Sequence, residues 1–236
     1  MVKLLKKFKE KDNSMYDICL LMDFSMDRKK LVKDLKRQGY IHSKSVEDSM
    51  LSVSRERFVP DNVKRVAYID HPLDIGNNQT ISAPHMVAIM TEAMNLSLGQ
   101  CVLEIGTGSG YHAAVVSKVI GNNGHLFSIE RFEELAENAR QHLRQEGVNN
   151  VTVIVGDGSL GLEEHAPFDC IYVTCSAPTI PPPLKDQVRI GGRIVIPVGR
   201  VIGQLFILVR TKNGFQKESH CGCAFVPLIG KYGFEY

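Results

Sequence analysis

The sequence predicts an α/β protein with a doubly wound, mostly parallel sheet, an N-terminal helical attachment and a C-terminal β-hairpin. Strand and helix patterns alternate along the middle of the chain, which is typical of parallel sheets. A buried strand at 101–105 runs directly into a glycine loop at 106–110. Two later apolar runs end in acidic residues, Glu130 and Asp157. Because parallel strands present their carboxyl ends at one edge, these features are expected to share a site.

The chain has 236 residues, 44% of them hydrophobic, which is enough for the core of one domain. We expect residues 1–25 to form a basic extension and residues 26–236 to form the domain. Within that domain, 26–84 would hold N-terminal helices and an acceptor loop, 85–200 the cofactor-binding core, and 201–236 the hairpin.

Two helices are expected before the core. Asp27 can cap the first, which extends to about residue 38. Ser45 and Asp48 resemble a capping box at the start of the second, and the segment 58–60 ends it with a proline. A third helix has Pro84 in its first turn.

The core then alternates in a regular order. The expected elements are helix 111–120, strand 125–129, helix 131–146, strand 151–155, strand 169–174, helix 181–190 and strand 193–197. Two further apolar runs, 204–210 and 221–226, flank the turn 212–214 and predict the hairpin.

The glycine loop indicates a nucleotide-like ligand. Gly106, Gly108 and Gly110 lack the Cβ atoms that would block a close approach, and a helix N-terminus follows them. A dinucleotide fingerprint requires a third glycine where Tyr111 stands. The G-x-G-x-G spacing, with Glu104 two residues before it, resembles the first motif of class I S-adenosylmethionine methyltransferases. This resemblance implies S-adenosyl-L-methionine as the cofactor.

The two acids downstream agree with that cofactor. Glu130 follows the loop by about 20 residues, where a carboxylate can accept hydrogen bonds from ribose hydroxyls. Asp157 lies in Gly156-Asp157-Gly158, a segment that contacts adenine in methyltransferases of this class. The resemblance therefore assigns both acids to the cofactor site.

Charge and composition exclude several partners. The net charge is +2, so the basic field that drives phosphate binding is absent, and we expect no nucleic-acid partner. The apolar stretch at 18–22 is too short to span a membrane, and lysines in the first dozen residues are expected to be solvated. No export signal is recognisable. We expect a cytoplasmic monomer.

The chain has six cysteines, which in a reducing cytosol are expected to remain thiols. His220-Cys221-Gly222-Cys223 is the one segment that resembles a metal-binding pattern. No second pair of ligands accompanies it, so no metal is expected.

The block Ile75–His85 is the candidate acceptor site, expected to be a polar loop that enters a helix. Ser82 lies just before the helix N-terminus, which favours an anion. Two roles for Ser82 stay open on this basis. Its hydroxyl either orients an acidic acceptor or only caps the helix.

Four pieces of the sequence resemble the protein-L-isoaspartate O-methyltransferase family. They are Phe58-Val59-Pro60 with Ala67-Tyr68, the block 79–86, the loop 103–110, and Phe225-Val-Pro-Leu-Ile-Gly230. The likeness covers roughly residues 28–234. Asp74 and the pair Asn77-Asn78 depart from the family pattern, which leaves the peptide preference open.

This resemblance implies transfer of a methyl group from S-adenosylmethionine to the α-carboxyl of L-isoaspartyl residues in damaged peptides and proteins. Ser82 would act as the catalytic residue that orients the carboxylate, and the implied cofactor residues are Gln79, Thr80, Ile81, Glu104, Gly106, Thr107, Gly108, Gly110, Glu130, Asp157 and Gly158. His85, Val226, Pro227 and Leu228 would join Ser82 in binding the substrate, the last three by backbone pairing with an extended peptide.

Two alternatives remain open. One is a class I methyltransferase with an RNA or small-molecule acceptor, although Val173-Thr-Cys-Ser-Ala-Pro178 lacks the motif typical of amino-group methylation of nucleic acids. The other is a noncatalytic protein that binds S-adenosylmethionine, which fold alone does not exclude.

Overall fold

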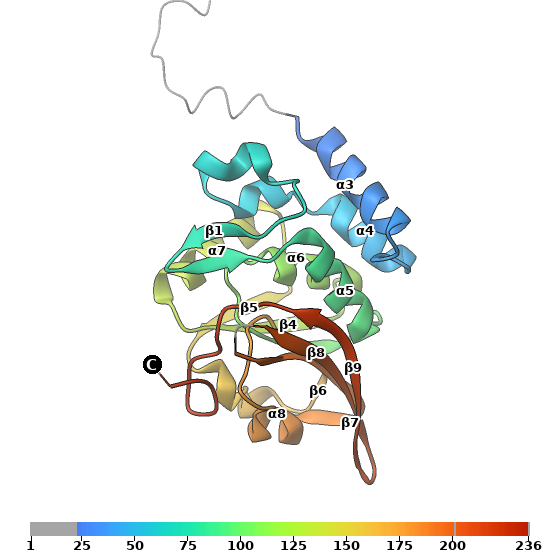
Figure 1. Cartoon of the computed structure of the whole chain (residues 1–236), viewed down its shortest axis with the longest axis vertical. Helices are drawn as coiled ribbons and strands as arrows, with labels where there is room; N and C mark the ends of the chain where they lie inside the picture. The colour runs from blue at the N-terminus through green and yellow to red at the C-terminus, as the bar shows by residue number, and fades with distance from the viewer. Residues whose placement is uncertain (1–22, 201, 236) are drawn as a thin grey trace, which may run out of the picture.

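The computed structural model describes residues 23–200 and 202–235, and a seven-stranded sheet lies at its centre (Figure 1). The strand order is β5-β4-β3-β6-β7-β8-β9. The strands are β3 (Cys101–Ile105), β4 (His125–Glu130), β5 (Val151–Val155), β6 (Phe168–Val173), β7 (Val188–Gly199), β8 (Gly203–Thr211) and β9 (Gly214–Cys223). Pairs from β5 to β7 are parallel, whereas β8 and β9 pair antiparallel. The expected α/β fold with a C-terminal hairpin is confirmed.

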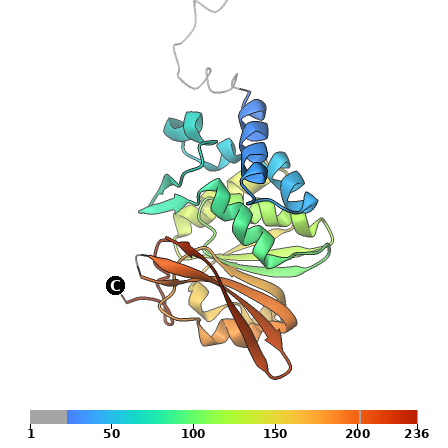
Figure 2. The same cartoon turned by 45° about the vertical axis from the view of Figure 1, so that its right-hand side comes forward.

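Helices cover both faces of the sheet (Figure 2). One face carries α3 (Ser25–Arg37), α4 (Lys44–Ser52), α5 (Pro84–Met94), α6 (Tyr111–Ile120) and α7 (Glu133–Gln145), and the other carries α8 (Pro182–Gln187). Short 3₁₀ turns are η1 (Arg55–Phe58), η2 (Asp61–Val66), η3 (Gly158–Leu160) and η4 (Glu163–His165). Helix α3 packs on α4, and α4 packs on α6, so the N-terminal helices extend the first layer.

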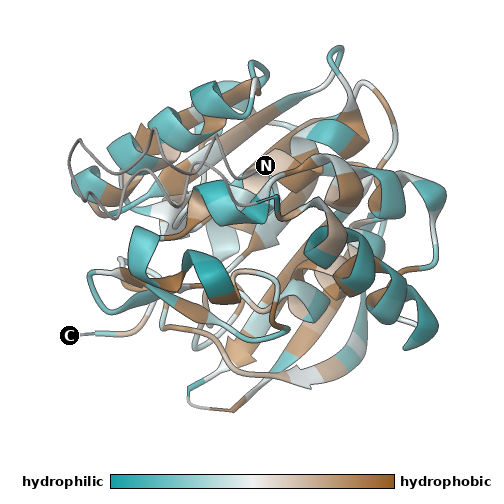
Figure 3. Cartoon of the chain, turned by 90° about the horizontal axis from the view of Figure 1, so that it is seen from above, coloured by the Kyte–Doolittle hydropathy of each residue, from teal (hydrophilic) through white to brown (hydrophobic). Residues whose placement is uncertain are grey.

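Side chains that alternate between the two faces of the strands form two apolar clusters, one on each side of the sheet. In β3, Val102 joins the cluster under α5 and α6, and Leu103 joins the cluster under α8. Successive side chains of a strand point to opposite faces, so a strand covered on both sides must be apolar throughout. Helices α3 and α7 show the complementary pattern, with one apolar stripe and one polar face (Figure 3), whereas nearly all of α6 is buried. In α7 the buried stripe is Leu135, Ala136, Ala139 and Leu143.

The caps of the first two helices were wrongly predicted. Helix α3 begins at Ser25, so Asp27 lies in its first turn, and Asp23 accepts a hydrogen bond from the Ser25 amide at 2.9 Å. Helix α4 is capped by Ser43, whose hydroxyl accepts from the Val46 amide at 3.3 Å. Ser43 has the extended backbone that an N-cap requires, so the helix starts before Ser45.

Two predicted boundaries near the C-terminus were also wrong. Helix α8 ends at Gln187, because Val188 pairs with Phe168 and begins β7. Strand β9 begins at Gly214 rather than at 221, and Val226 lies beyond its end. Most β9 side chains are exposed at the edge of the sheet, so the strand has no apolar run that sequence could reveal.

The block expected to be a polar loop contains a small hairpin. Strand β1 (Leu73–Gly76) pairs antiparallel with β2 (Gln79–Ile81). Asn77 and Asn78 form its turn with φ of 53° and 55°. The type I′ hairpin turn requires positive φ at both central positions, which asparagine tolerates better than most residues. The pair that departs from the family pattern therefore still satisfies the turn.

The basic extension and the apolar stretch at 18–22 lie outside the described residues, apart from residues 23–25. Among the helices that the structure describes, none is long and apolar enough to cross a membrane.

Candidate functional site

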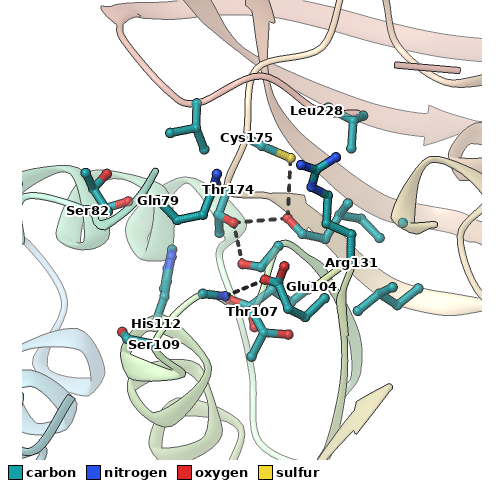
Figure 4. Close-up of a pocket in the computed structure, with 18 of the residues that line it drawn as sticks. Gln79, Ser82, Glu104, Thr107, Ser109, His112, Arg131, Thr174, Cys175 and Leu228 are labelled. Carbon is teal, nitrogen blue, oxygen red and sulfur yellow. Dashed lines mark hydrogen bonds between the residues drawn. The ribbon is translucent and has the colours of Figure 1, made fainter. Parts of the chain in front are cut away.

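A cavity lies at the carboxyl ends of β3, β4 and β6, and we call it the central pocket (Figure 4). Its volume is about 770 Å³ with its mouth to solvent included, within the usual range for small-molecule sites. The predicted site residues that line it are Gln79, Thr80, Ile81, Ser82, Glu104, Gly106, Thr107, Gly108, Glu130, Gly158, Val226, Pro227 and Leu228. The fold thus brings together the hairpin β1–β2, the glycine loop and the segment after β9.

The glycine loop is shaped by close packing against Thr174. Gly106 has a φ of 96°, and a Cβ atom there would lie 2.4 Å from Thr174 Oγ1. The Thr174 hydroxyl donates to the Gly106 carbonyl at 2.5 Å. Gly110 does not line the central pocket; it is the N-cap of α6, and its backbone packs against Ala139 of α7. The first two loop glycines therefore shape the pocket, whereas the third permits helix packing.

Glu104 places a buried carboxyl group in the central pocket. Its side chain is fully buried, and its Oε2 accepts a hydrogen bond from Ser128 Oγ, which lies 2.5 Å from Thr107 Oγ1. The buried Tyr172 hydroxyl is near this carboxyl group and acts to lower its pKa, but in the part of the chain that the structure describes neither that hydroxyl nor Glu104 Oε1 has a hydrogen-bond partner within bonding geometry. Burial raises the pKa of Glu104 to about 8. Such a carboxyl group suits a ligand that brings a positive charge or a donor.

Glu130 is fixed at the end of β4 by two backbone amides. Its Oε2 accepts from the Gly108 amide at 2.9 Å, and its Oε1 accepts from the Phe132 amide at 3.0 Å. Each carboxylate oxygen has a second lone pair, so both oxygens keep acceptor capacity for hydroxyl groups of a ligand.

Asp157 is turned away from the central pocket. Its Oδ1 accepts from the Ser159 amide at 2.9 Å and from the Ser159 hydroxyl at 2.7 Å, and its Oδ2 accepts from the Lys231 amide at 2.8 Å. Partial burial opposes ionisation, but these hydrogen bonds hold its pKa below the usual range. The neighbouring Gly156 and Gly158 line the pocket, and the Asp157 side chain does not.

A second cavity adjoins the first, and we call it the side groove. It is lined by Pro72, Thr80, Ser82, Ala83, His85, Met86, Thr174, Gly222, Cys223, Ala224, Phe225 and Val226. Four residues, Thr80, Ser82, Thr174 and Val226, line both cavities. The two cavities therefore meet at these residues.

Ser82 lies between strand β2 and helix α5 at this junction. The N-cap of α5 is Ala83, and it is the Asp70 carboxylate, not the hydroxyl of Ser82, that accepts a hydrogen bond from an amide of the first turn. His85 lines only the side groove, where its Nδ1 lies 2.9 Å from Asp70 Oδ1. The same carboxylate oxygen accepts from the His85 amide at 2.9 Å, which fixes the first turn of α5.

The segment 226–228 is tied to the end of β6. The Ser176 amide donates to the Val226 carbonyl at 2.8 Å, and the Leu228 amide donates to the Ser176 carbonyl at 2.8 Å. These two backbone groups are already paired within the chain. These two groups are therefore not free to pair with an extended peptide, whereas a role in substrate binding for Pro227 and the rest of the segment stays a prediction.

Several pocket residues were missed from the sequence. Thr174 and Cys175 follow β6, and Arg131 follows Glu130. Thr174 and Cys175 could have been predicted, because they follow a parallel strand and Glu130 was predicted from its place at the end of one. They were missed because neither residue is acidic. His112 also lines the pocket from α6, and burial lowers its pKa to about 3, so it is neutral.

Among the described residues there is neither a metal-binding cluster nor a disulfide bond. No group of three or more His, Cys, Asp or Glu among them is arranged to hold a metal ion. The five cysteines that the structure describes are free thiols.

Comparison with known proteins identifies relatives over nearly the whole chain. The family model of protein-L-isoaspartate(D-aspartate) O-methyltransferase matches residues 26–233. The protein-L-isoaspartate O-methyltransferase of Hyperthermus butylicus is 51% identical over 221 residues, which cover 89% of this chain and 92% of the relative. Protein-L-isoaspartate O-methyltransferase 1 of Archaeoglobus fulgidus is 51% identical over 213 residues, covering 90% and 98%.

Solved structures agree with these relatives. A protein-L-isoaspartate O-methyltransferase superposes with a TM-score of 0.80 at 30% identity, covering 87% of this chain and 67% of that one. A Plasmodium falciparum protein described as a β-aspartate methyltransferase, solved with S-adenosyl-L-homocysteine, gives a TM-score of 0.76 at 27% identity, covering 86% and 98%.

Proposed function

The chain belongs to the protein-L-isoaspartate(D-aspartate) O-methyltransferase family, and from this premise we propose that it methylates the α-carboxyl of L-isoaspartyl residues in damaged peptides and proteins. The observation that carries the proposal is the meeting of the central pocket and the side groove at Thr80, Ser82, Thr174 and Val226. Group transfer requires donor and acceptor in contact. The central pocket would hold the methyl donor, and the side groove would hold the peptide.

The central pocket fits S-adenosylmethionine in three respects. The unpartnered Oε1 of Glu104 suits the positively charged end of the molecule. The glycine loop admits a ligand close to its backbone, and Glu130 offers acceptors for ribose hydroxyls. When bound, this cofactor supplies an electrophilic methyl group on a sulfonium sulfur.

The chain needs no general base for this reaction. A carboxyl group with an ordinary pKa near 4 is already ionised at neutral pH, so the acceptor is a ready nucleophile. Its oxygen bonds to the methyl carbon as the sulfur–methyl bond breaks, and the electron pair of that bond stays on sulfur. The products are a methyl ester and S-adenosylhomocysteine, and no proton moves.

The rate acceleration must therefore come from the positioning of the methyl donor and the acceptor carboxylate. The Ser82 hydroxyl, which is not used as a helix cap, would donate a hydrogen bond to the acceptor carboxylate at the junction of the two cavities. Holding two reactants in line contributes up to about 7–11 kcal/mol in favourable models.

The ester then closes to a succinimide with loss of methanol, and hydrolysis of this ring returns part of the chains to the normal aspartyl link. The activity is accordingly one of protein repair. A net charge of +2 supplies no strong basic field of the kind that drives nucleic-acid binding, and we propose protein as the partner. We further propose that the enzyme works as a monomer in the cytoplasm.

The direct test is methyl transfer from labelled S-adenosylmethionine to two matched peptides, one with an L-isoaspartyl link and one with the normal L-aspartyl link. A structured RNA serves as the third acceptor, and calorimetry measures cofactor binding separately. We expect label only in the isoaspartyl peptide. Label in RNA, or cofactor binding without label in any acceptor, would overturn the proposal.

A further inference from the structure

Arg55 is a fully buried cation at the start of η1. Among residues 23–200 and 202–235, no carboxylate lies within salt-bridge distance of it, and its Nη1 has no hydrogen-bond partner. Buried charges are rare and are usually paired, because removing them from water is costly. The proposed reaction gives this arginine no direct contact, so its burial requires another explanation.

The guanidinium group joins three separate parts of the chain. Its Nε donates to the Ala67 carbonyl at 2.8 Å, and its Nη2 donates to the Ser82 carbonyl at 2.9 Å. Its central carbon lies 4.8 Å from the ring centroid of Tyr111, which lines the central pocket. One rigid planar group thus links the segment before the hairpin, the junction serine and the first residue of α6.

Ser82 needs such an anchor. It belongs neither to β2, which ends at Ile81, nor to α5, which begins at Pro84. The hairpin that leads to it has only two strands. Lysine could not replace the arginine in this place, because a single ammonium group cannot reproduce the planar fork that bonds two carbonyls at once.

Arg55 is itself held by the N-terminal helices. Its amide donates to the Tyr68 hydroxyl at 3.1 Å, and the Arg28 Nε of α3 donates to the same hydroxyl at 2.8 Å. Tyr68 in turn donates to Glu56, which pairs with Arg28 at 3.2 Å. The helical attachment therefore reaches Ser82 through one continuous set of hydrogen bonds.

We propose that Arg55 is the positioning residue for Ser82, holding its backbone so that the hydroxyl meets the acceptor at the junction of the two cavities. The inference rests on the proposed methyltransferase function. The buried positive charge, partly offset by the Asp70 carboxylate, also favours an anion in the adjoining cavities, although Arg55 lines neither of them. This charge stabilises the carboxylate before transfer more than during it, since transfer neutralises that carboxylate. Loss of the charge should therefore raise the peptide KM, whereas loss of the bridge should lower kcat.

The test compares Arg55→Lys, which keeps the charge, with Arg55→Met, which keeps the volume alone. Arg57→Lys is the matched control, because Arg57 lies two residues away on η1 and its side chain is half exposed while it pairs with the buried Glu146. We expect Arg55→Lys to lower kcat about ten- to a hundredfold with the peptide KM little changed. Arg55→Met should lower kcat and also raise the KM, and the cofactor Kd should stay within about twofold in all three.

A double-mutant cycle identifies the route of the effect. Once Ser82→Ala has removed the hydroxyl, Arg55→Lys should lower kcat no further. If the decreases in kcat were additive, or if neither Arg55 variant folded, Arg55 would have only a structural role and the inference would be overturned. Hydrogen exchange gives a readout apart from activity: the amides of residues 81–83, 85 and 86 should exchange faster in Arg55→Met, and those of β5 should not. If the wild type were inactive but exchange increased as expected, the proposed function would be refuted and the anchoring of Ser82 by Arg55 would be demonstrated. If exchange were unchanged, that anchoring would be refuted.

Discussion

The carboxylate of Glu130 accepts a hydrogen bond from the Gly108 amide at 2.9 Å, and this contact fixes the glycine loop to the end of β4. The same carboxylate is the proposed acceptor for ribose hydroxyls. One side chain thus both shapes the loop and is available to a ligand, because each oxygen accepts more than one hydrogen bond.

Glu130→Ala should therefore raise the Kd for S-adenosylmethionine about a hundredfold, since two hydrogen bonds to a charged group are lost at about 1.5 kcal/mol each. Isothermal titration calorimetry measures this directly. Glu133→Gln is the control, because Glu133 is exposed in the first turn of α7. A Kd for Glu130→Ala within twofold of the wild type would remove Glu130 from the cofactor site.

Ser82 and Ser43 allow catalysis and capping to be separated. Ser82→Ala should lower kcat strongly while leaving the melting temperature and the cofactor Kd unchanged, because its hydroxyl caps no helix. Ser43→Ala should do the reverse: it removes the cap of α4 and should cost about 0.5–2 kcal/mol of stability with kcat intact. Steady-state kinetics and thermal unfolding on both variants decide the matter. Normal turnover in Ser82→Ala would end its catalytic assignment.

The parts of the site that could be predicted follow one physical rule. Parallel strands end at the same edge, so the loop after β3 and the acid that ends β4 were predictable from apolar runs and the residues at their ends. Asp157 follows the same pattern, yet its carboxylate is engaged by the Ser159 and Lys231 amides. The amide of Lys231 comes from a segment 74 residues away, which no local pattern reveals.

Other features could not be predicted from the sequence, for different reasons. Strand β9 lies at the sheet edge with polar side chains, so it carries no periodic signal. Arg55 looks like a surface residue in a charged stretch, and only the packing of Ala67, Ser82 and Tyr111 around it accounts for its burial. Sequence patterns find elements and their ends, whereas contacts between distant loops depend on the assembled fold.

Glu104 gives the protein a predictable dependence on pH. Burial raises its pKa from 4.5 to about 8, so between these values the folded chain keeps a proton that the unfolded chain releases. The free energy of unfolding should therefore fall as pH rises through this window. Glu104→Gln removes the titrating group and should flatten that part of the profile. Urea unfolding of both proteins from pH 5 to pH 9 measures the difference.

The same carboxyl group should couple cofactor binding to a proton. A cationic ligand favours the ionised form of Glu104, so binding at pH 7 should release a proton, and wild-type affinity should rise towards pH 8. Calorimetry in two buffers of different ionisation enthalpy detects the release. Glu104→Gln should release none, and an equal release from both proteins would assign the proton to another group.

The turn of the β1–β2 hairpin should control cofactor affinity from outside the pocket. Asn77 and Asn78 both have positive φ, a conformation that costs a β-branched residue about 1–2 kcal/mol. Asn77→Val and Asn78→Val should therefore distort the hairpin that brings Gln79 and Thr80 to the central pocket, and should weaken S-adenosylmethionine binding several-fold.

The corresponding glycine variants accept positive φ and should bind as the wild type does. Asn213→Val, in the other hairpin and without positive φ, serves as the control for the valine side chain itself. Weakened binding in the glycine variants as well would mean that the asparagine side chains, rather than the backbone of the turn, carry the effect.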